Sequence, residues 1–179
     1  MNDLKNIRFQ RWTLAGSWTG IIYATLYIAR PVCEFFKQYS WFPVAVNISI
    51  FLCIAVIVGI FLKKKRLHQT LADPYLFLII AGYGAGMMLI SIPEERLHFI
   101  EYGILAALVY WALILDLENN RAYAWAFVIT SLIGVGDEGI QYLLPNRYYQ
   151  FQDVCLNSAS AALGLIFIFV ICRQKESYH

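Results

Sequence analysis

Polar side chains at helical spacing interrupt the apolar C-terminal half of this chain, and the first group begins at His98. Glu101 follows His98 by three residues and Tyr102 by four, so the three side chains would share one face of a helix. A histidine in such a setting can hydrogen-bond an anion, bind a metal or accept a proton. His98 is therefore a candidate ligand-binding residue and a candidate general base, with Glu101 and Tyr102 beside it.

Two further groups along the chain carry the same kinds of side chain. Asp137, Glu138 and Gln141 lie within about one helical turn, and Glu138 and Gln141 are three residues apart on one face. Asp153 and Asn157 are four residues apart, which also gives them a common face. The candidate ligand-binding residues are therefore His98, Glu101, Tyr102, Asp137, Glu138, Gln141, Arg147, Asp153 and Asn157.

Two kinds of chemistry fit this set. Arg147 and His98 could hold an anionic headgroup, because a planar guanidinium can bond two phosphate oxygens at once. Alternatively, Glu95 and His98 have the Glu-x-x-His spacing of carboxylate metal sites in helix bundles, or His98 could act as a base oriented by Glu138. Only one Glu-x-x-His is present, whereas di-metal bundles use two. Anion binding is therefore the leading hypothesis, and no cofactor is expected.

The rest of the chain is far more apolar than a soluble domain. Its 179 residues are 60% hydrophobic and 15% charged, against about 45–50% and about 25% in soluble domains. The apolar residues form long runs, which are typical of membrane-spanning helices of about 20 residues. The sequence therefore predicts an all-α, multi-pass transmembrane bundle of about six helices, at residues 12–29, 41–62, 74–92, 97–117, 122–144 and 154–172.

The distribution of Lys and Arg predicts the orientation of this bundle. With the N-terminus inside, ten of the 14 Lys and Arg residues fall in inside segments and four in outside segments. Cytoplasmic loops of membrane proteins carry the excess of positive charge. We therefore expect a protein of the cytoplasmic (inner) membrane with both termini in the cytoplasm.

This topology brings the polar groups to one level near the outer surface. Counted from Ala122, Glu138 lies about 24 Å above the inner boundary of a hydrocarbon core about 30 Å thick. A carboxylate at that depth is costly and commonly marks a functional site that faces the bundle interior. Outer helix ends are also where polar residues belong, and Asp153 could simply be a first-turn acid. The depth of Glu138 favours the functional interpretation.

Two pairs of residues suggest further contacts. Gly82 and Gly86 form a G-x-x-x-G pair, which allows close helix packing within the bundle and, less often, homodimerisation. Cys33 and Cys155 both fall near the predicted outer surface, where an oxidising compartment could join them. No basic stripe interleaved with aromatic residues is present, so no nucleic-acid partner is expected.

The polar residues also form an ordered series of short motifs. These are H-F-x-x-Y from His98 to Tyr102, D-E-x-x-Q from Asp137 to Gln141, P-x-R ending at Arg147, and D-x-x-x-N from Asp153 to Asn157. This series resembles the VanZ-like family of bacterial multi-pass membrane proteins. The resemblance implies two parts, a two-helix membrane segment at residues 1–72 and a VanZ-like four-helix membrane domain at residues 73–179.

One position departs from the family pattern. The family often has an acid–Lys pair four and three residues before its histidine, but here those positions are Glu94 and Glu95, followed by Arg96. Arg96 is one residue later than the family lysine, which turns its side chain by about 100° around the helix. The role of that lysine is therefore not assigned to Arg96.

The resemblance implies a role at the outer face of the membrane, near lipid headgroups or peptidoglycan precursors. The family is named after a protein linked to teicoplanin resistance, so a link to glycopeptide resistance is one expectation. The leading hypothesis is a bacterial cell-envelope protein that binds or handles an anionic lipid or a lipid-linked precursor. A membrane-embedded enzyme that uses a metal or a His/Glu pair is the alternative, and a transporter is the least favoured.

Overall fold

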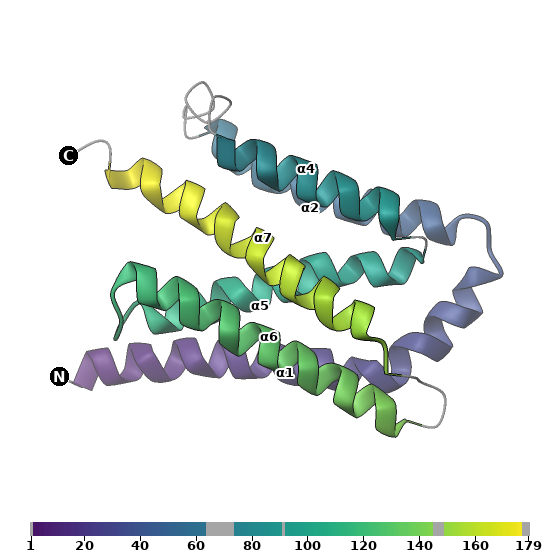
Figure 1. Ribbon diagram of the computed structural model, residues 1–179, viewed down its shortest axis with the longest axis horizontal. Coiled ribbons are helices and arrows are strands. Elements are labelled where there is room, and N and C mark those ends of the chain that lie inside the picture. Colours follow the sequence, from purple (N-terminus) through teal and green to yellow (C-terminus); the bar gives the residue numbers. More distant parts are fainter. Residues whose placement is uncertain (1, 64–73, 91, 145–148, 177–179) are drawn as a thin grey trace.

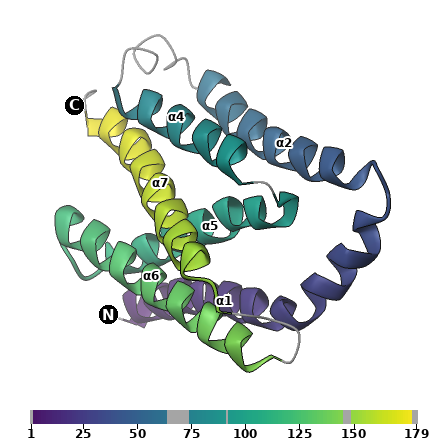
Figure 2. The ribbon, with the colours of Figure 1, turned by 45° about the vertical axis from the view of Figure 1, so that its right-hand side comes forward.

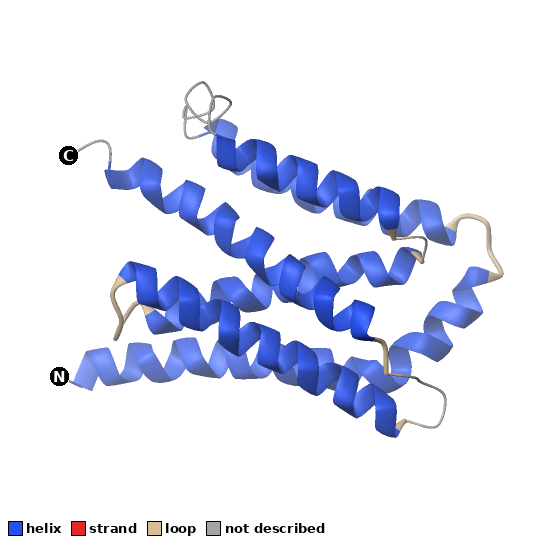
Figure 3. Cartoon of the chain, in the orientation of Figure 1, coloured by secondary structure: helices blue, strands red, loops and turns tan. Residues whose placement is uncertain are grey.

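The computed structural model describes residues 2–63, 74–90, 92–144 and 149–176. These residues form six α-helices, one 3₁₀ helix and no strand (Figure 3). The elements are α1 (Asn2–Lys37), α2 (Phe42–Lys63), α4 (Pro74–Leu89), η1 (Pro93–Leu97), α5 (His98–Leu113), α6 (Asn119–Leu143) and α7 (Phe151–Glu176). The predicted all-α fold is confirmed, and each of the six predicted apolar runs lies mostly within one α-helix.

Helix α1 is longer than the predicted helix at residues 12–29, because it begins at Asn2 and continues through Pro31 to Lys37. A proline inside a helix removes one backbone hydrogen bond and crowds the preceding turn. Its usual effect in a long helix is a kink, and the ribbon of α1 changes direction before its C-terminal end (Figures 1 and 2). The predicted end at residue 29 is therefore wrong.

Helix α5 lies at the centre of the assembly, packed against α1, α6 and α7. Helix α4 packs against α7, whereas α2 contacts the rest mainly through η1. The start of α1 and the end of α7 lie at the same end of the molecule (Figure 1). Helices α5 and α7 both begin at the opposite end of the molecule and run toward the end that holds the termini (Figure 1). Helix α6 runs in the reverse direction. The predicted boundary at residues 72 and 73 lies outside the described residues and stays a prediction.

Helices α5 and α7 cross with their backbones in close contact. A Cβ atom built on Gly164 would lie 2.8 Å from both the Cα and the carbonyl oxygen of Gly103. Real Cβ atoms essentially never come so close to a neighbouring backbone. The two backbones can therefore approach this closely only because Gly164 lacks a side chain, as in the small-residue contacts of membrane helices.

The G-x-x-x-G pair of α4 is also used within the chain. A Cβ on Gly82 would meet the side chain of Leu163 on α7, and one on Gly86 would meet the ring of Phe99 on α5. This face of α4 therefore packs on the protein's own bundle. A homodimer through Gly82 and Gly86 stays a prediction.

Polar side chains lie inside the assembly, while many large apolar side chains lie on its surface. The buried polar residues are Thr130, Asp137, Glu138, Gln141, Asp153, Asn157 and Ser160. By contrast, Met88 and Leu89 are 89% and 81% exposed. Among the described residues, one segment is long and apolar enough to cross a membrane, Phe151–Val170, and the shorter apolar segments are Phe42–Leu52 and Phe77–Gly86.

Candidate functional site

Three helices bring their polar groups to one end of the molecule, the end opposite the termini. Helix α5 begins there with His98, and α7 begins there with Phe151. Helix α6 arrives there with its C-terminal half, which contains Asp137, Glu138 and Gln141. Because α6 and α7 are joined by a short link, their polar faces meet next to the first turns of α5.

The centre of the site is a buried hydrogen-bond network between α5 and α6. The hydroxyl of Tyr102 donates to Asp137 Oδ2 at 2.6 Å. The amide nitrogen of Gln141 donates to Asp137 Oδ1 at 3.2 Å and to Glu138 Oε1 at 2.9 Å. Tyr102, Asp137 and Glu138 are each 0% exposed and Gln141 is 2% exposed. One amide thus bridges two buried carboxylates.

The first residues of α7 continue this network. The backbone N–H of Gln150 donates to Glu138 Oε2 at 3.0 Å, and the Gln150 side-chain amide reaches Asp153 Oδ2 at 3.5 Å. The backbone N–H groups at a helix start have no partner within the helix, so a carboxylate is well suited to accept from them. Glu138 of α6 therefore ties the end of its own helix to the beginning of α7.

His98 and Glu101 lie on the α5 side of this network. His98 Nδ1 is 3.7 Å from Glu101 Oε2, and the imidazole ring centre is 5.9 Å from that of Tyr102. Nδ1 is buried without a hydrogen-bond partner, and the Glu101 side chain is 35% exposed. These contacts of His98 lie on its own helix, whereas the hydrogen bonds of Glu138 given above go to Gln141 and Gln150. The assignment of His98 as a base oriented by Glu138 stays a prediction.

Asn157 lies beside the network with an unsatisfied amide. Its side chain is 0% exposed, and neither Nδ2 nor Oδ1 has a hydrogen-bond partner. It packs against Gly134, where a Cβ would lie 2.9 Å from Asn157 Cβ and 3.3 Å from Tyr102 Cε1. Gly134 therefore provides the space in which Asn157 and Tyr102 come together.

The predicted cation Arg147 lies outside the described residues. Arg96, the cation nearest to His98 in sequence, faces other partners. Its guanidinium donates to the carbonyl of Ile90 from Nε and Nη2, at 3.1 and 2.8 Å, and to Oδ1 of Asn47 from Nη1. Arg96 thus connects the residue that follows α4 to α2. Its guanidinium is directed to these partners, so Arg96 does not replace the lysine that the family often has before its histidine.

A comparison with known families identifies the part of the chain that contains this network. Residues 93–173 match the family model described as VanZ/LLP1. The chain therefore carries a VanZ-like domain. No curated protein and no solved structure gives a significant match. The resemblance expected from the sequence motifs is confirmed, and every candidate ligand-binding residue falls within the matched range.

Within the VanZ-like domain, the described residues give no support to the metal alternative. No group of three or more His, Cys, Asp or Glu side chains in that part of the chain could hold a metal ion. The Glu95–His98 pair on its own is too few ligands for a metal site of this kind. Neither Cys33 nor Cys155 forms a disulfide, so the suggested disulfide between them is not formed here.

Sequence reasoning missed the support that α1 gives to the VanZ-like domain. Trp18 donates from its indole nitrogen to the backbone carbonyl of Glu101 at 3.0 Å. The hydroxyl of Tyr23 donates to the carbonyl of Ile133 at 2.7 Å and would meet a Cβ on Gly136. Both aromatic residues look like ordinary interfacial side chains in the sequence. Gly136, next to Asp137, was the available signal, since a glycine beside a functional residue permits close approach.

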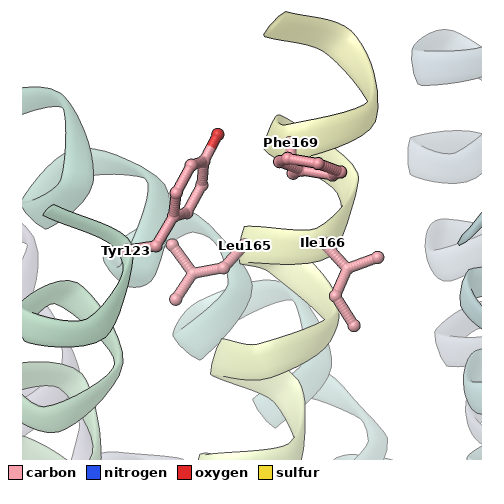
Figure 4. A pocket seen from close by; sticks show the side chains of 4 residues that line it. All are labelled: Tyr123, Leu165, Ile166 and Phe169. Atoms are coloured by element: carbon pink, nitrogen blue, oxygen red, sulfur yellow. The ribbon is translucent and has the colours of Figure 1, made fainter. Parts of the chain in front are cut away.

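A second feature lies at the other end of the α6–α7 contact. Tyr123, Leu165, Ile166 and Phe169 line a cavity of about 290 Å³ (Figure 4). The lining is apolar apart from the hydroxyl of Tyr123. Fourteen residues separate Tyr123 from Asp137 on α6, which is about 21 Å along the helix. The apolar cavity is therefore distinct from the polar network of the VanZ-like domain.

Proposed function

We propose that this protein crosses the bacterial cytoplasmic membrane several times, with both termini in the cytoplasm. We further propose that the polar network of its VanZ-like domain binds a phosphate-bearing headgroup of a lipid or lipid-linked envelope precursor at the outer leaflet. The observation that carries this proposal is the Gln141 amide bridging two fully buried carboxylates, Asp137 and Glu138. Burying two carboxylates in a membrane protein costs free energy, and buried acids of this kind are typical of functional sites.

The surface and the interior both support a membrane environment. Large apolar side chains cover the outside, including Phe77 at 72% and Leu132 at 64% exposure. The buried residues are mostly apolar but include fully buried carboxylates and amides, and in soluble proteins Asp and Glu are almost never fully buried unless paired. The shared end of α1 and α7 fits two termini on one side (Figure 1). The excess of Lys and Arg in the segments at that side points to the cytoplasm.

On this proposal, Arg147 supplies the positive charge for the phosphate. It belongs to the link between α6 and α7, next in sequence to the network residues at both ends of that link. Carboxylates could hold one edge of its guanidinium while the other edge bonds two phosphate oxygens. This role explains why the candidate site has more carboxylates than arginines: the carboxylates would orient the guanidinium that contacts the phosphate.

The orientation can be tested by labelling in intact cells. A cysteine placed at Asn146 should react with an impermeant thiol reagent, and one placed at Lys65 should not. The reverse pattern would move the polar site to the cytoplasmic face and end the outer-leaflet proposal.

Binding can be tested with polyprenyl phosphate in phosphatidylcholine nanodiscs, with the bound lipid counted by native mass spectrometry. Wild-type protein should retain polyprenyl phosphate in preference to phosphatidylcholine. Arg147→Lys should weaken this retention about tenfold or more, because the bidentate fork is lost although the charge is kept. Arg121→Lys is the matched control, since Arg121 is exposed at the start of α6. Equal retention of both lipids by the wild type would refute the proposal.

A further inference from the structure

The unsatisfied amide of Asn157 requires a physical explanation. Its side chain is 0% exposed, and both its donor and its acceptor atom lack a partner. Leaving a buried amide unpaired destabilises a protein, and nearly all buried polar groups in native proteins are hydrogen-bonded. An apolar side chain of similar size would remove the cost. Asn157 therefore differs from Tyr102 and Gln141, whose polar side chains donate hydrogen bonds within the network.

The packing holds this amide firmly in place. Gly134 of α6 comes so close that an added Cβ would lie 2.9 Å from Asn157 Cβ and 3.3 Å from Nδ2. The same Cβ would lie 3.3 Å from the ring of Tyr102, whose hydroxyl already donates to Asp137. The amide thus faces the space between α5, α6 and α7, beside the network and deeper than Asp153. Ligand binding would require α6 and α7 to separate at Gly134, a residue that contributes no side chain of its own to this contact.

The chemistry of an amide differs from that of its charged neighbours. Carboxylates only accept hydrogen bonds and a guanidinium only donates them, whereas an amide does both. A ligand group that pairs with both ends of the Asn157 amide must therefore offer at least one donor and one acceptor. Sugar hydroxyls and secondary amides have these properties, and a bare phosphate does not.

We propose that Asn157 forms an uncharged subsite that recognises a hydroxyl or amide group on the headgroup, so that the ligand is a glycosylated lipid phosphate. This inference rests on the proposed headgroup-binding function and adds the class of headgroup. Ligand binding would supply the partner that the amide lacks. Asn157 then destabilises the free protein and stabilises the complex, a compromise that is common at functional sites.

The test compares two lipids that differ only in the sugar: polyprenyl diphosphate, and polyprenyl diphosphate bearing N-acetylglucosamine, each in phosphatidylcholine nanodiscs. Wild-type protein should bind the glycosylated lipid more tightly, about tenfold or more. Asn157→Leu should reduce the affinity for the glycosylated lipid to that for the bare diphosphate, without changing the latter. It should also raise the melting temperature of the lipid-free protein, because an unsatisfied amide is replaced by an apolar group of similar size.

Ser160→Ala is the matched control on the same helix. Ser160 is also 0% exposed, but its hydroxyl donates to the carbonyl of Leu156 at 2.7 Å, so it should leave lipid selectivity unchanged. If Asn157→Leu fails to accumulate, Asn157→Ala tests the same loss of selectivity.

The possible failures can be told apart. Equal wild-type affinity for the two lipids would overturn the subsite but leave phosphate binding intact, whereas no binding of either lipid would overturn the proposed function itself. A lower melting temperature of lipid-free Asn157→Leu, with selectivity unchanged, would show that the amide is satisfied by structural water and would refute the inference.

Discussion

The contact between α6 and α7 has two ends of opposite character. At the end away from the termini, Asp137 and Gln141 join a network with directional hydrogen bonds. At the other end, the Tyr123 ring stacks on Tyr110 at 4.2 Å and meets the Phe169 ring edge-on at 5.9 Å. The first end is specified by individual atoms and the second by shape and apolar area. A change of one atom should therefore be felt strongly at the polar end, while the apolar end should tolerate repacking.

The largest expected effect comes from the crossing of α5 and α7 that holds both ends together. Gly164→Ala should lower the free energy of unfolding by about 3 kcal/mol, because its Cβ would meet the backbone of Gly103. Gly139→Ala is the matched control, since a Cβ there has nothing within 4 Å, and it should stabilise α6 by about 0.5–1 kcal/mol. Unfolding in mixed micelles by titration with dodecyl sulfate measures both. Equal effects would mean that the crossing is not close-packed.

A smaller effect is expected from one hydroxyl at the polar end. Tyr102→Phe removes the hydrogen bond to Asp137 Oδ2, and leaving that buried carboxylate short of a donor should cost about 1–3 kcal/mol of unfolding free energy. Tyr142→Phe is the control, because Tyr142 is 69% exposed on α6, and its effect should stay within about 0.5 kcal/mol. The same micelle titration applies. If the two variants behave alike, the polar end does not depend on single atoms.

The smallest effect is expected at the apolar end. Phe169→Leu keeps an apolar side chain beside Tyr123 and Leu165, so it should cost less than about 1.5 kcal/mol. Retention of polyprenyl phosphate should not change, because the cavity lies about 21 Å from the network. A large loss of lipid retention in this variant would mean that the headgroup binds at the apolar end, which contradicts the proposal.

Much of the fold could be predicted from the sequence because long apolar runs determine where helices form. The spacing within each helix also paired His98 with Glu101 and Gln141 with Glu138 correctly, since neighbours on one helix face depend only on helical geometry. The family motifs fall within residues 93–173, the range that matches the VanZ/LLP1 family model. These parts of the prediction rest on local geometry.

The contacts between helices could not be derived in the same way. The position of Asn157 against Gly134, the turn of Arg96 toward Ile90, and the hydrogen bond from Gln150 to Glu138 all depend on how helices rotate and shift against each other. Those rotations are set by side-chain packing at crossings such as Gly103 with Gly164. The continuation of α1 through Pro31 is a further case, because neighbouring helices can support a kinked helix.

The central claim is that the polar end of the VanZ-like domain, and not the apolar end, receives a lipid headgroup. A polyprenyl phosphate with a diazirine next to its phosphate tests this directly. After illumination in nanodiscs, peptide mass spectrometry should find cross-links between residues 137 and 157 and at the start of α5, in competition with unlabelled polyprenyl phosphate. Cross-links concentrated around Tyr123 and Phe169, or spread evenly over the helices and insensitive to competition, would contradict the account.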